Sequence, residues 1–529
     1  MAAAYCRRLG LVELVDQMVP THMALRPGLV VQAMVLDTLS GRTPLYRVER
    51  FLNGQDVELL LGVSITAHAF NDTNLARSLD AMFAAGTSKI VTELGIRATC
   101  AFRLDTTVPS YDTTSTSVWG DYRACELEQP PPGPRVTHGH SKDHLPELKQ
   151  FMTELLCVDR GVPIFGRTLD GNSSDKTSNN QILSRIGSIM ARHGLGPGAF
   201  VYVADAAMVT EKNLNAVDAG VWVDIGPLAE NTAGSARPSA EYRAFETSVV
   251  LYGNTYRAVV VHSSSHDKRR QKKLDKAIAE STKSVKTALG GLQKVYFCET
   301  DARTAAARGE KLSDKLHTVT ATVRPVKVRR RGRPPANGLA PMNTRYELSW
   351  ELAEDTAGVA RERSLAGCFV LLSNVPTEGE GALDAARLLR TYKGQYGVES
   401  DFAFLKDPLV VNDLFLKTPS RIDAFGMVLI ITLMVWRLME RAMRAHVENA
   451  KTTLPGWDNR DTTKPTAFMM TTVMTGIMVA LIGGQRFMLR GPGPTQLAFL
   501  EALGLGPPAF LDPRYRCAPI IAFRLLTKG

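Results

Sequence analysis

The sequence predicts a mixed α/β fold, in which a sheet with flanking helices is followed by a second β-rich region and bounded by helical N- and C-terminal regions. Three observations support this class. Apolar residues recur at helical spacing over residues 1–98 and again beyond residue 376. Strand-like and helical runs alternate over residues 99–227. A second series of strand-like runs fills residues 228–375, which predicts a separate β-rich region before the last helices.

The first 98 residues are expected to be helical. The segment NDTNLARSLDAMFAAG has an Asn71-Asp72 cap at its start and Gly86 at its end, so a helix is predicted between them. Residues 25–41 also carry apolar side chains at helical spacing. We therefore assign residues 1–98 to a helical N-terminal region.

Residues 99–227 are expected to build the first part of a mixed sheet. Predicted strands at 108–120 and 121–129 flank a Gly-Asp turn, and residues 161–171 form a third strand. A helix at 175–194, a short apolar strand at 200–208, a helix at 210–220 and a strand at 221–227 follow. Hairpin strands followed by β-α-β alternation favour a sheet with helices on its faces.

The remaining chain divides into a β-rich region and two helical parts. Strand-like runs at 242–262, 317–328, 344–353 and 367–375 define the β-rich region of residues 228–375, which two basic segments interrupt. Residues 376–450 are expected to be mostly helical, and residues 451–529 to form a helical C-terminal region.

Composition narrows the functional class. The chain has 529 residues, a net charge of +10 and a pI near 9.2, which favours polyanionic partners such as nucleic acid. Its seven dispersed cysteines fit a reducing compartment and argue against a disulfide framework or a zinc ribbon. The N-terminus lacks the apolar stretch of a signal peptide, and the apolar run at 424–436 is shorter than a membrane span, so we expect a buried helix there, no membrane partner and a cytoplasmic protein.

Three acidic residues on separate predicted elements are the candidate catalytic and metal-binding residues. Asp112 begins a strand that should fill a core, and Asp205 ends a short apolar strand. Glu399 lies on a predicted helix with Tyr392 and Lys406 seven residues to either side, which places the three along one stripe, with Gln395 beside them. Oxygen ligands gathered at a sheet end suit Mg²⁺ and phosphoryl chemistry. The alternatives are ordinary ones: Asp112 as a turn residue, Asp205 as a helix N-cap and Glu399 as a solvated charge.

The segment YKGQYGVESDFAFLKDPL resembles the Y-x2-R-x3-E-x6-K signature of bacterial transposases of the "insertion sequence four" family, in the DDE class. Tyr392, Glu399 and Lys406 match that signature, and Gln395 stands where the signature has Arg. The resemblance extends over most of the chain, through residues 28–52, 71–82, 111–122, 138–151, 161–177 and 201–214. The chain departs from the family at Leu145, where a basic residue is expected, and at the strand end VDIGP.

This resemblance implies an RNase H-like catalytic core with Asp112, Asp205 and Glu399 as its three acids. It also implies that residues 228–375 are a β-rich insertion domain and that residues 376–450 complete the core. It implies a Mg²⁺ cofactor, for which Mn²⁺ can substitute, and a homodimer in the DNA complex. The partners would be the inverted-repeat ends of the protein's own element, bound in part by residues 1–98, and target DNA. The implied reaction is cleavage at those ends and transfer of the 3′-hydroxyl to target DNA. The alternatives are a nuclease without strand transfer and a DNA-binding protein that no longer cleaves.

Asp105 is an alternative first acid, because FRLDTTVPSYDTT contains Asp-Thr-Thr twice. Residues 105 and 112 would face opposite sides of one strand, and Pro109 disfavours a continuous strand between them. Asp112 directly precedes the strand, as in the family, and is our preferred first acid.

Several basic groups are candidate DNA contacts. Arg331 and Arg333 lie in an Arg-Gly-Arg-Pro core that resembles an AT-hook; the alternative is a solvated linker. Lys142 lies among His138, His140 and His144, where the lack of nearby cysteines argues against zinc. With the signature residues Tyr392, Gln395 and Lys406, these basic residues complete the expected DNA-contacting set. The basic segment 266–289 predicts an amphipathic helix that packs on the insertion strands and touches phosphates.

Overall fold

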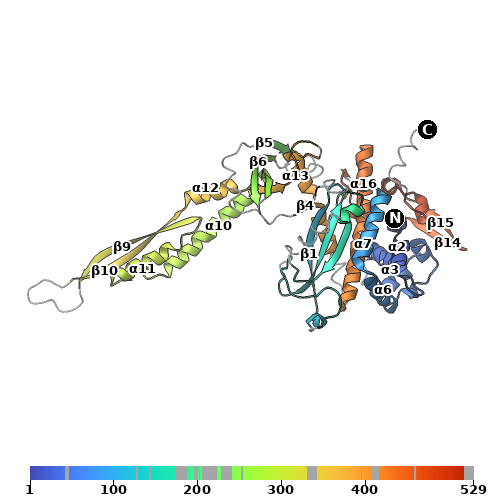
Figure 1. Cartoon of the computed structure of the whole chain (residues 1–529), viewed down its shortest axis with the longest axis horizontal. Coiled ribbons are helices and arrows are strands. Elements are labelled where there is room, and N and C mark those ends of the chain that lie inside the picture. Colours follow the sequence, from blue (N-terminus) through green and yellow to red (C-terminus); the bar gives the residue numbers. More distant parts are fainter. Residues whose placement is uncertain are drawn as a thin grey trace, which may run out of the picture. The chain divides into compact units, whose positions relative to one another are not determined.

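The computed structural model divides the chain into two compact units (Figure 1). Unit 1 comprises residues 1–205, 377–383 and 387–529, and unit 2 comprises residues 206–376 and 384–386. The structure describes the whole chain except residues 42–46, 127–128, 142–144, 174–187, 196–200, 202, 205–222, 228–240, 252–253, 330–341, 380, 395, 407–415, 458–459 and 518–529, and it leaves undescribed some further side chains, among them those of residues 396–399.

Unit 1 begins with a set of short helices, as the apolar spacing predicts. In α6 (Asp72–Ala85), the Asn71 side chain accepts a hydrogen bond from the Asn74 amide and Gly86 follows the last turn, so the predicted cap and stop are both confirmed. The other elements of this region are α1 (Ala2–Leu9), α2 (Leu11–Met18), α3 (Pro27–Leu36), the π-helical turn η1 (Asp37–Gly41), α4 (Val48–Asn53), α5 (Val57–Leu61), the 3₁₀ turn η3 (Ala67–Phe70) and α7 (Thr87–Phe102).

The central sheet of unit 1 has the strand order β3-β2-β1-β4. Strands β1 (Ser110–Val118), β2 (Lys149–Val158) and β3 (Val162–Leu169) are antiparallel neighbours, whereas β4 (Val203–Ala204) is parallel to β1. The sheet is therefore mixed, as predicted, and its parallel pair brings the end of β4 beside the start of β1.

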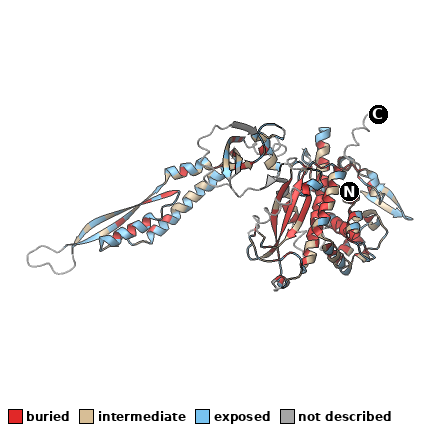
Figure 2. Cartoon of the chain, viewed as in Figure 1, coloured by how far each residue is buried: buried red, intermediate tan, exposed pale blue. Residues whose placement is uncertain are grey.

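Helices α7 and α16 (Pro419–Ala450) pack against β3 and against each other. Gly166 of β3 leaves room for this contact, because a Cβ atom there would lie 3.0 Å from Cδ1 of Ile430 on α16. Figure 2 shows buried residues concentrated in the sheet and in these helices. Helix α16 is long and apolar enough to span a membrane by length and composition, yet its apolar window is fully buried inside the protein.

Replacement of Gly95 by Ala should destabilise unit 1. A Cβ atom at Gly95 would lie 2.3 Å from the Ile164 carbonyl oxygen, so α7 would have to move off the sheet. We expect the free energy of unfolding to fall by about 2 kcal/mol, the usual cost of overpacking, seen as a lower midpoint in thermal denaturation. Gly394→Ala is the control, since nothing lies within 4 Å of a Cβ atom there. Equal midpoints for Gly95→Ala and the wild type would contradict the close approach.

The described residues of unit 2 form two sheets and three helices. The strands β5 (Val223–Pro227), β6 (Glu241–Leu251), β7 (Asn254–Ser263) and β11 (Cys368–Ser373) form one sheet in the order β11-β7-β6-β5. The strands β8 (Val295–Tyr296), β9 (His317–Arg329) and β10 (Met342–Glu354) form the other, in the order β8-β10-β9. The helices are α10 (Ser264–Gly290), α11 (Glu299–Glu310) and α12 (Thr356–Leu365). The strands predicted over 242–375 and the basic helix are thus confirmed as elements.

In unit 2, the helices α10 and α11 pack against the sheet of β9 and β10. Gly309 of α11 faces the Trp350 ring, where a Cβ atom would lie 1.9 Å from a ring carbon. Val285 and Leu289 of α10 pack with Val319 of β9 in a small cluster. Much of β9 and β10 is otherwise exposed (Figure 2), so these two strands contribute few residues to a core.

Three sequence expectations about strands differ from the structure. Residues 123–126 form a 3₁₀ turn, η4 (Arg123–Glu126), and not a hairpin strand, because Tyr122 adopts a positive φ of 47° and its carbonyl accepts from the Cys125 amide. The partner of β1 is instead β2, which the sequence analysis did not assign. Strand β5, expected in the first sheet, pairs with β6 of unit 2.

The C-terminal region is only partly helical. Besides α17 (Ala467–Val473), α18 (Pro494–Ala502) and the 3₁₀ turn η8 (Pro507–Phe510), it holds two antiparallel pairs, β12 (Leu454–Pro455) with β13 (Asp461–Thr462) and β14 (Met478–Ile482) with β15 (Gln485–Arg490). Gly483 and Gly484 both have positive φ and form the turn between β14 and β15. That Gly-Gly turn between two apolar runs is the hairpin signal that a wholly helical prediction overlooks.

Candidate active site and nucleic-acid interface

Asp112 is the third residue of β1 and is partly buried. Its Oδ1 accepts a hydrogen bond of 2.7 Å from the Thr113 amide, and its strand partner on β2 is Leu155. Thr113, Thr114, Ser115 and Thr116 after it are all buried, so this strand fills a core with hydroxyl and methyl groups while its carboxylate sits near the strand start.

The parallel pair of strands relates the positions of the first two acids in register. Ala204 at the end of β4 pairs with Tyr111, and these are the residues immediately before Asp205 and Asp112. The Val201 amide, ahead of β4, also donates 2.8 Å to the Thr107 carbonyl oxygen. Asp205 itself lies outside the described residues.

Asp105, the alternative first acid, is placed in the loop before β1. Its Oδ1 accepts from the amide of Thr107 at 2.9 Å and from the hydroxyl of Thr107 at 2.6 Å, and its own amide donates to Asp159. These bonds make Asp105 a turn residue, whereas Asp112 lies on the strand next to β4.

The signature segment lies on the helices α13 (Ala385–Gly394) and α14 (Tyr396–Leu405). Tyr392 is on α13, and Lys406 directly follows α14 with its amide bonded to the Phe402 carbonyl oxygen. Glu399 lies on α14, but its side chain, like the whole of Gln395, lies outside the described part of the chain. Helix α14 packs on β1, β2 and α16, so the helix that carries Glu399 contacts the strand that carries Asp112.

A buried carboxyl group on α14, Asp401, links that helix to the sheet. The Asp401 side chain is fully buried, and its Oδ2 accepts from the Cys157 thiol of β2 at 3.4 Å. Burial raises the pKa of Asp401 to about 7, although the nearby Arg437 guanidinium opposes that shift. Burial, and then the charges of Asp401 and Asp112, raise the pKa of the Cys157 thiol. The sequence analysis missed Asp401; its position two residues after Glu399 was the available signal.

The raised pKa of Asp401 predicts a pH-dependent stability that Asp401→Asn removes. The unfolded chain loses this proton near the ordinary pKa of 3.8, while the folded protein keeps it up to about pH 7. The contribution of Asp401 to the free energy of unfolding therefore falls as pH rises from about 4 to about 7, by on the order of 4 kcal/mol at most. Above about pH 7 this contribution is constant. The unfolding midpoint of Asp401→Asn, measured against the wild type, should rise across this interval. Parallel profiles would contradict it.

Side chains able to hold a divalent cation are described at only one of the three predicted positions. Among the residues whose placement is described, no group of three His, Cys, Asp or Glu side chains gathers in a way that would hold a metal. Asp205 and the Glu399 side chain are outside that set. His138 and His140 are described, while His144 and Lys142 are not.

A basic stripe runs along α10 of unit 2. It consists of exposed cations at helical spacing, Lys268, Lys272, Lys276, Lys283 and Lys286, and spans about 27 Å along the helix axis. Val285 and Leu289 of the same helix are buried. Lys276 also lies 3.7 Å from Glu280, so this position is partly neutralised. A row of exposed cations of this length suits a nucleic-acid backbone.

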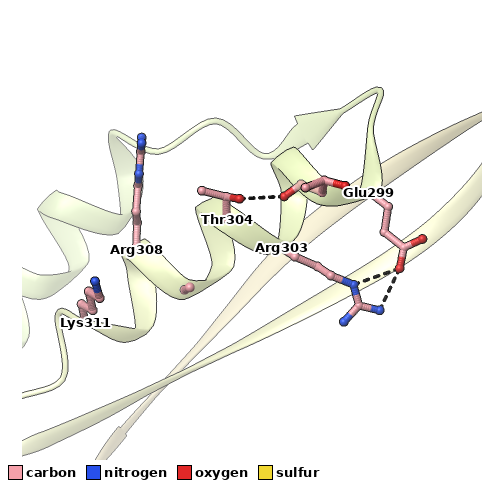
Figure 3. Close-up of a pocket in the computed structure, with 7 residues that line it drawn as sticks. Glu299, Arg303, Thr304, Arg308 and Lys311 are labelled. Atoms are coloured by element: carbon pink, nitrogen blue, oxygen red, sulfur yellow. Dashed lines mark hydrogen bonds and ion pairs between the residues drawn. The ribbon is translucent and has the colours of Figure 1, made fainter.

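A second cationic feature of unit 2 is a depression of about 590 Å³ on α11. Figure 3 shows Arg303 bound to Glu299 one turn earlier, whereas Arg308 and Lys311 project separately from the later turns. Its lining comes from α11 and the residue after it, so it is a shallow surface and not a substrate pocket. Arg331 and Arg333 lie outside the described residues, in the segment that joins β9 to β10 beyond the Arg329–Met342 pair.

One part of the chain, at its N-terminus, matches a known protein family. Residues 1–96 match the family described as a domain of unknown function (DUF4277). This domain is found in transposase-like proteins. No curated protein matches the chain. The match covers the N-terminal helices only.

Proposed function

We propose that the protein is a DDE-class transposase of the "insertion sequence four" family, which cleaves DNA at the inverted-repeat ends of its own element and joins the 3′-hydroxyl ends to target DNA. The observation that carries the proposal is the pairing of Ala204 with Tyr111. Ala204 and Tyr111 directly precede Asp205 and Asp112 in the sequence. The helix of Glu399 packs on the same strand.

The arrangement of elements in unit 1 supports an RNase H-like core. Three antiparallel strands are followed by a fourth strand parallel to the first, in the order β3-β2-β1-β4, which is the order expected of such a core. Unit 2 lies in the sequence between β4 and α14, where members of this family carry a β-rich insertion. The transposase-like N-terminal domain of residues 1–96 supports the same proposal.

The three candidate acids fit a Mg²⁺ site by their chemistry. Asp112 is a partly buried carboxylate whose Oδ1 accepts one amide hydrogen, and carboxylate oxygens are the ligands that Mg²⁺ prefers. Asp112, Asp205 and Glu399 would hold the metal, and Mn²⁺ would bind the same donors. When bound, such ions activate the attacking oxygen and stabilise the leaving oxygen of an in-line displacement at phosphorus.

The other residues would position the DNA. Tyr392 and Lys406 flank Glu399 on α13 and just beyond α14, where a phenol and an ammonium group can contact phosphate oxygens. The buried hydroxyl-rich strand after Asp112 keeps its backbone fixed while the chemistry proceeds at its start. Hydrolysis of a phosphodiester by water and strand transfer are both displacements at phosphorus, so one carboxylate site serves both steps.

The direct test of the proposal is cleavage of an end duplex taken from the DNA that flanks the gene. The wild-type protein should nick this duplex at the element boundary in Mg²⁺ and should not do so in EDTA. A scrambled duplex of equal length is the control. Tight binding without cleavage in either Mg²⁺ or Mn²⁺ would instead favour a DNA-binding protein that no longer cleaves.

Neutralising the basic stripe of α10 should weaken DNA binding at every sequence. In the triple variant Lys272→Gln, Lys276→Gln and Lys283→Gln, the slope of log affinity against log salt should shrink by about 2 to 3, because each phosphate contact contributes about 0.9. The matched control replaces three exposed lysines of unit 1, Lys89, Lys451 and Lys464, by Gln. Equal changes in both triples would mean that α10 is only a solvated face.

A further inference from the structure

Arg437 is a buried cation of α16 that binds the turn of α14 next to Glu399. Its residue is 7% exposed. Its Nε donates to Asp401 Oδ1 and its Nη2 donates to Ser400 Oγ. These acceptors belong to the two residues that directly follow Glu399, so one guanidinium holds both of them.

The same guanidinium is fixed from its other side. Nη1 of Arg437 donates to Oε2 of Glu440, one turn further along α16, and Glu440 is also buried. Oε1 of Glu440 accepts from the amide of Ala467 at 3.1 Å, at the start of α17. Since Asp401 also accepts from the Cys157 thiol, the network runs from α17 through α16 and α14 to β2, a neighbour of the strand of Asp112.

We propose that Arg437 is a positioning residue that fixes the turn of α14 carrying Glu399 against the sheet, so that the third carboxylate is placed before metal and DNA bind. This inference rests on the proposed function, because it assigns to Glu399 the role of the third acid.

The physical reason is that the apolar contacts described for α14 do not by themselves set its orientation. It is 10 residues long and contains Gly397, so neither length nor helix propensity holds it in place. The buried side chains of Phe402 and Leu405 hold the helix against its neighbours, but apolar contacts are not directional. A planar guanidinium with donors in a fixed fork is directional, and a buried network with paired donors admits few arrangements. Catalysis is sensitive to displacements of about 1 Å.

The test compares Arg437→Lys with Arg421→Lys. Lysine keeps the charge but cannot reach three acceptors in fixed directions. Arg421 lies on the same helix and binds both oxygens of Asp80 on α6 at 2.8 Å, so it undergoes the same chemical change away from α14. Two quantities are measured on the complex with the end duplex: the single-turnover cleavage rate in Mg²⁺, and the Mn²⁺ concentration at half-occupancy, followed by electron paramagnetic resonance without turnover.

We expect Arg437→Lys to lower the cleavage rate and raise the half-occupancy Mn²⁺ concentration, each by about tenfold or more, as for residues that orient metal ligands. Its affinity for the duplex should stay within about twofold, and Arg421→Lys should match the wild type in all three measurements. Ser400→Ala removes a single hydrogen bond of the network, and it should shift the same two quantities less. It therefore carries the test if Arg437→Lys does not fold.

Wild-type rates and Mn²⁺ affinities in Arg437→Lys, or in Ser400→Ala if Arg437→Lys does not fold, would overturn the inference, provided that Glu399→Gln abolishes cleavage. Failure of the proposed function would give a different result from failure of the positioning role of Arg437. If the wild type neither cleaves nor binds Mn²⁺, the assignment of Glu399 fails, and the positioning role fails with it.

Discussion

Asp112→Asn is expected to abolish cleavage of the end duplex while leaving its affinity within about threefold of the wild type. The substitution keeps the size of the side chain and an oxygen that can accept from the Thr113 amide, so β1 should remain intact. It removes the negative charge that would hold the divalent cation. We expect the cleavage rate to fall by at least about 10³-fold, the scale of losing a metal-held nucleophile. The measurement is single-turnover cleavage beside a gel-shift titration.

Asp105→Asn is the matched control for this prediction. Asp105 accepts from the amide and the hydroxyl of Thr107 in the loop before β1, and an asparagine oxygen can preserve those bonds. Its cleavage rate should therefore lie near that of the wild type. Loss of cleavage in Asp105→Asn together with normal cleavage in Asp112→Asn would reverse the choice of the first acid.

Glu399→Gln and Lys406→Ala should fail in different ways. Glu399→Gln removes a charge from the metal site, so cleavage should vanish with little loss of affinity. Lys406→Ala removes one positive contact to phosphate, so the slope of log affinity against log salt should shrink by about one. Its cleavage rate should largely recover at saturating protein, because the metal site is intact.

A salt titration of end-duplex binding beside the cleavage assay separates these two variants. Normal cleavage by Glu399→Gln would remove Glu399 from the site and leave the signature helix as a solvated face. An unchanged salt slope in Lys406→Ala would remove the phosphate contact but would not affect the acid assignment.

Local patterns predicted much of the secondary structure. The cap at Asn71 and the stop at Gly86 are properties of neighbouring residues, so the bounds of α6 were readable from the sequence. Strand β2 was not assigned, although it is a continuous buried run, because its partner β1 lies about 30 residues earlier and local turn signals favoured residues 121–129. Strand β5 was placed in the wrong sheet for the same reason: strand pairing is decided by tertiary contacts.

The candidate site shows the same division. Helical spacing predicted one helix with Tyr392, Glu399 and Lys406 along one stripe. The structure instead describes two helices, with Tyr392 on α13, Glu399 on α14 and Lys406 directly after α14. The bonds of Arg437 to Ser400 and Asp401 join residues 37 and 36 positions apart. No spacing rule connects such distant positions. The residues around a buried arginine in a long apolar helix do not predict which acceptors it binds.

The most direct test of the account is strand transfer by the purified wild-type protein. A precleaved end duplex with a free 3′-hydroxyl is incubated with a supercoiled plasmid in Mg²⁺, and the products are sequenced across each new joint. We predict joints between the 3′ end of the element and plasmid DNA, which are absent with a 3′-dideoxy end and with Asp112→Asn. Cleavage of uncut end duplex without any such joint would contradict the account and indicate a nuclease without strand transfer.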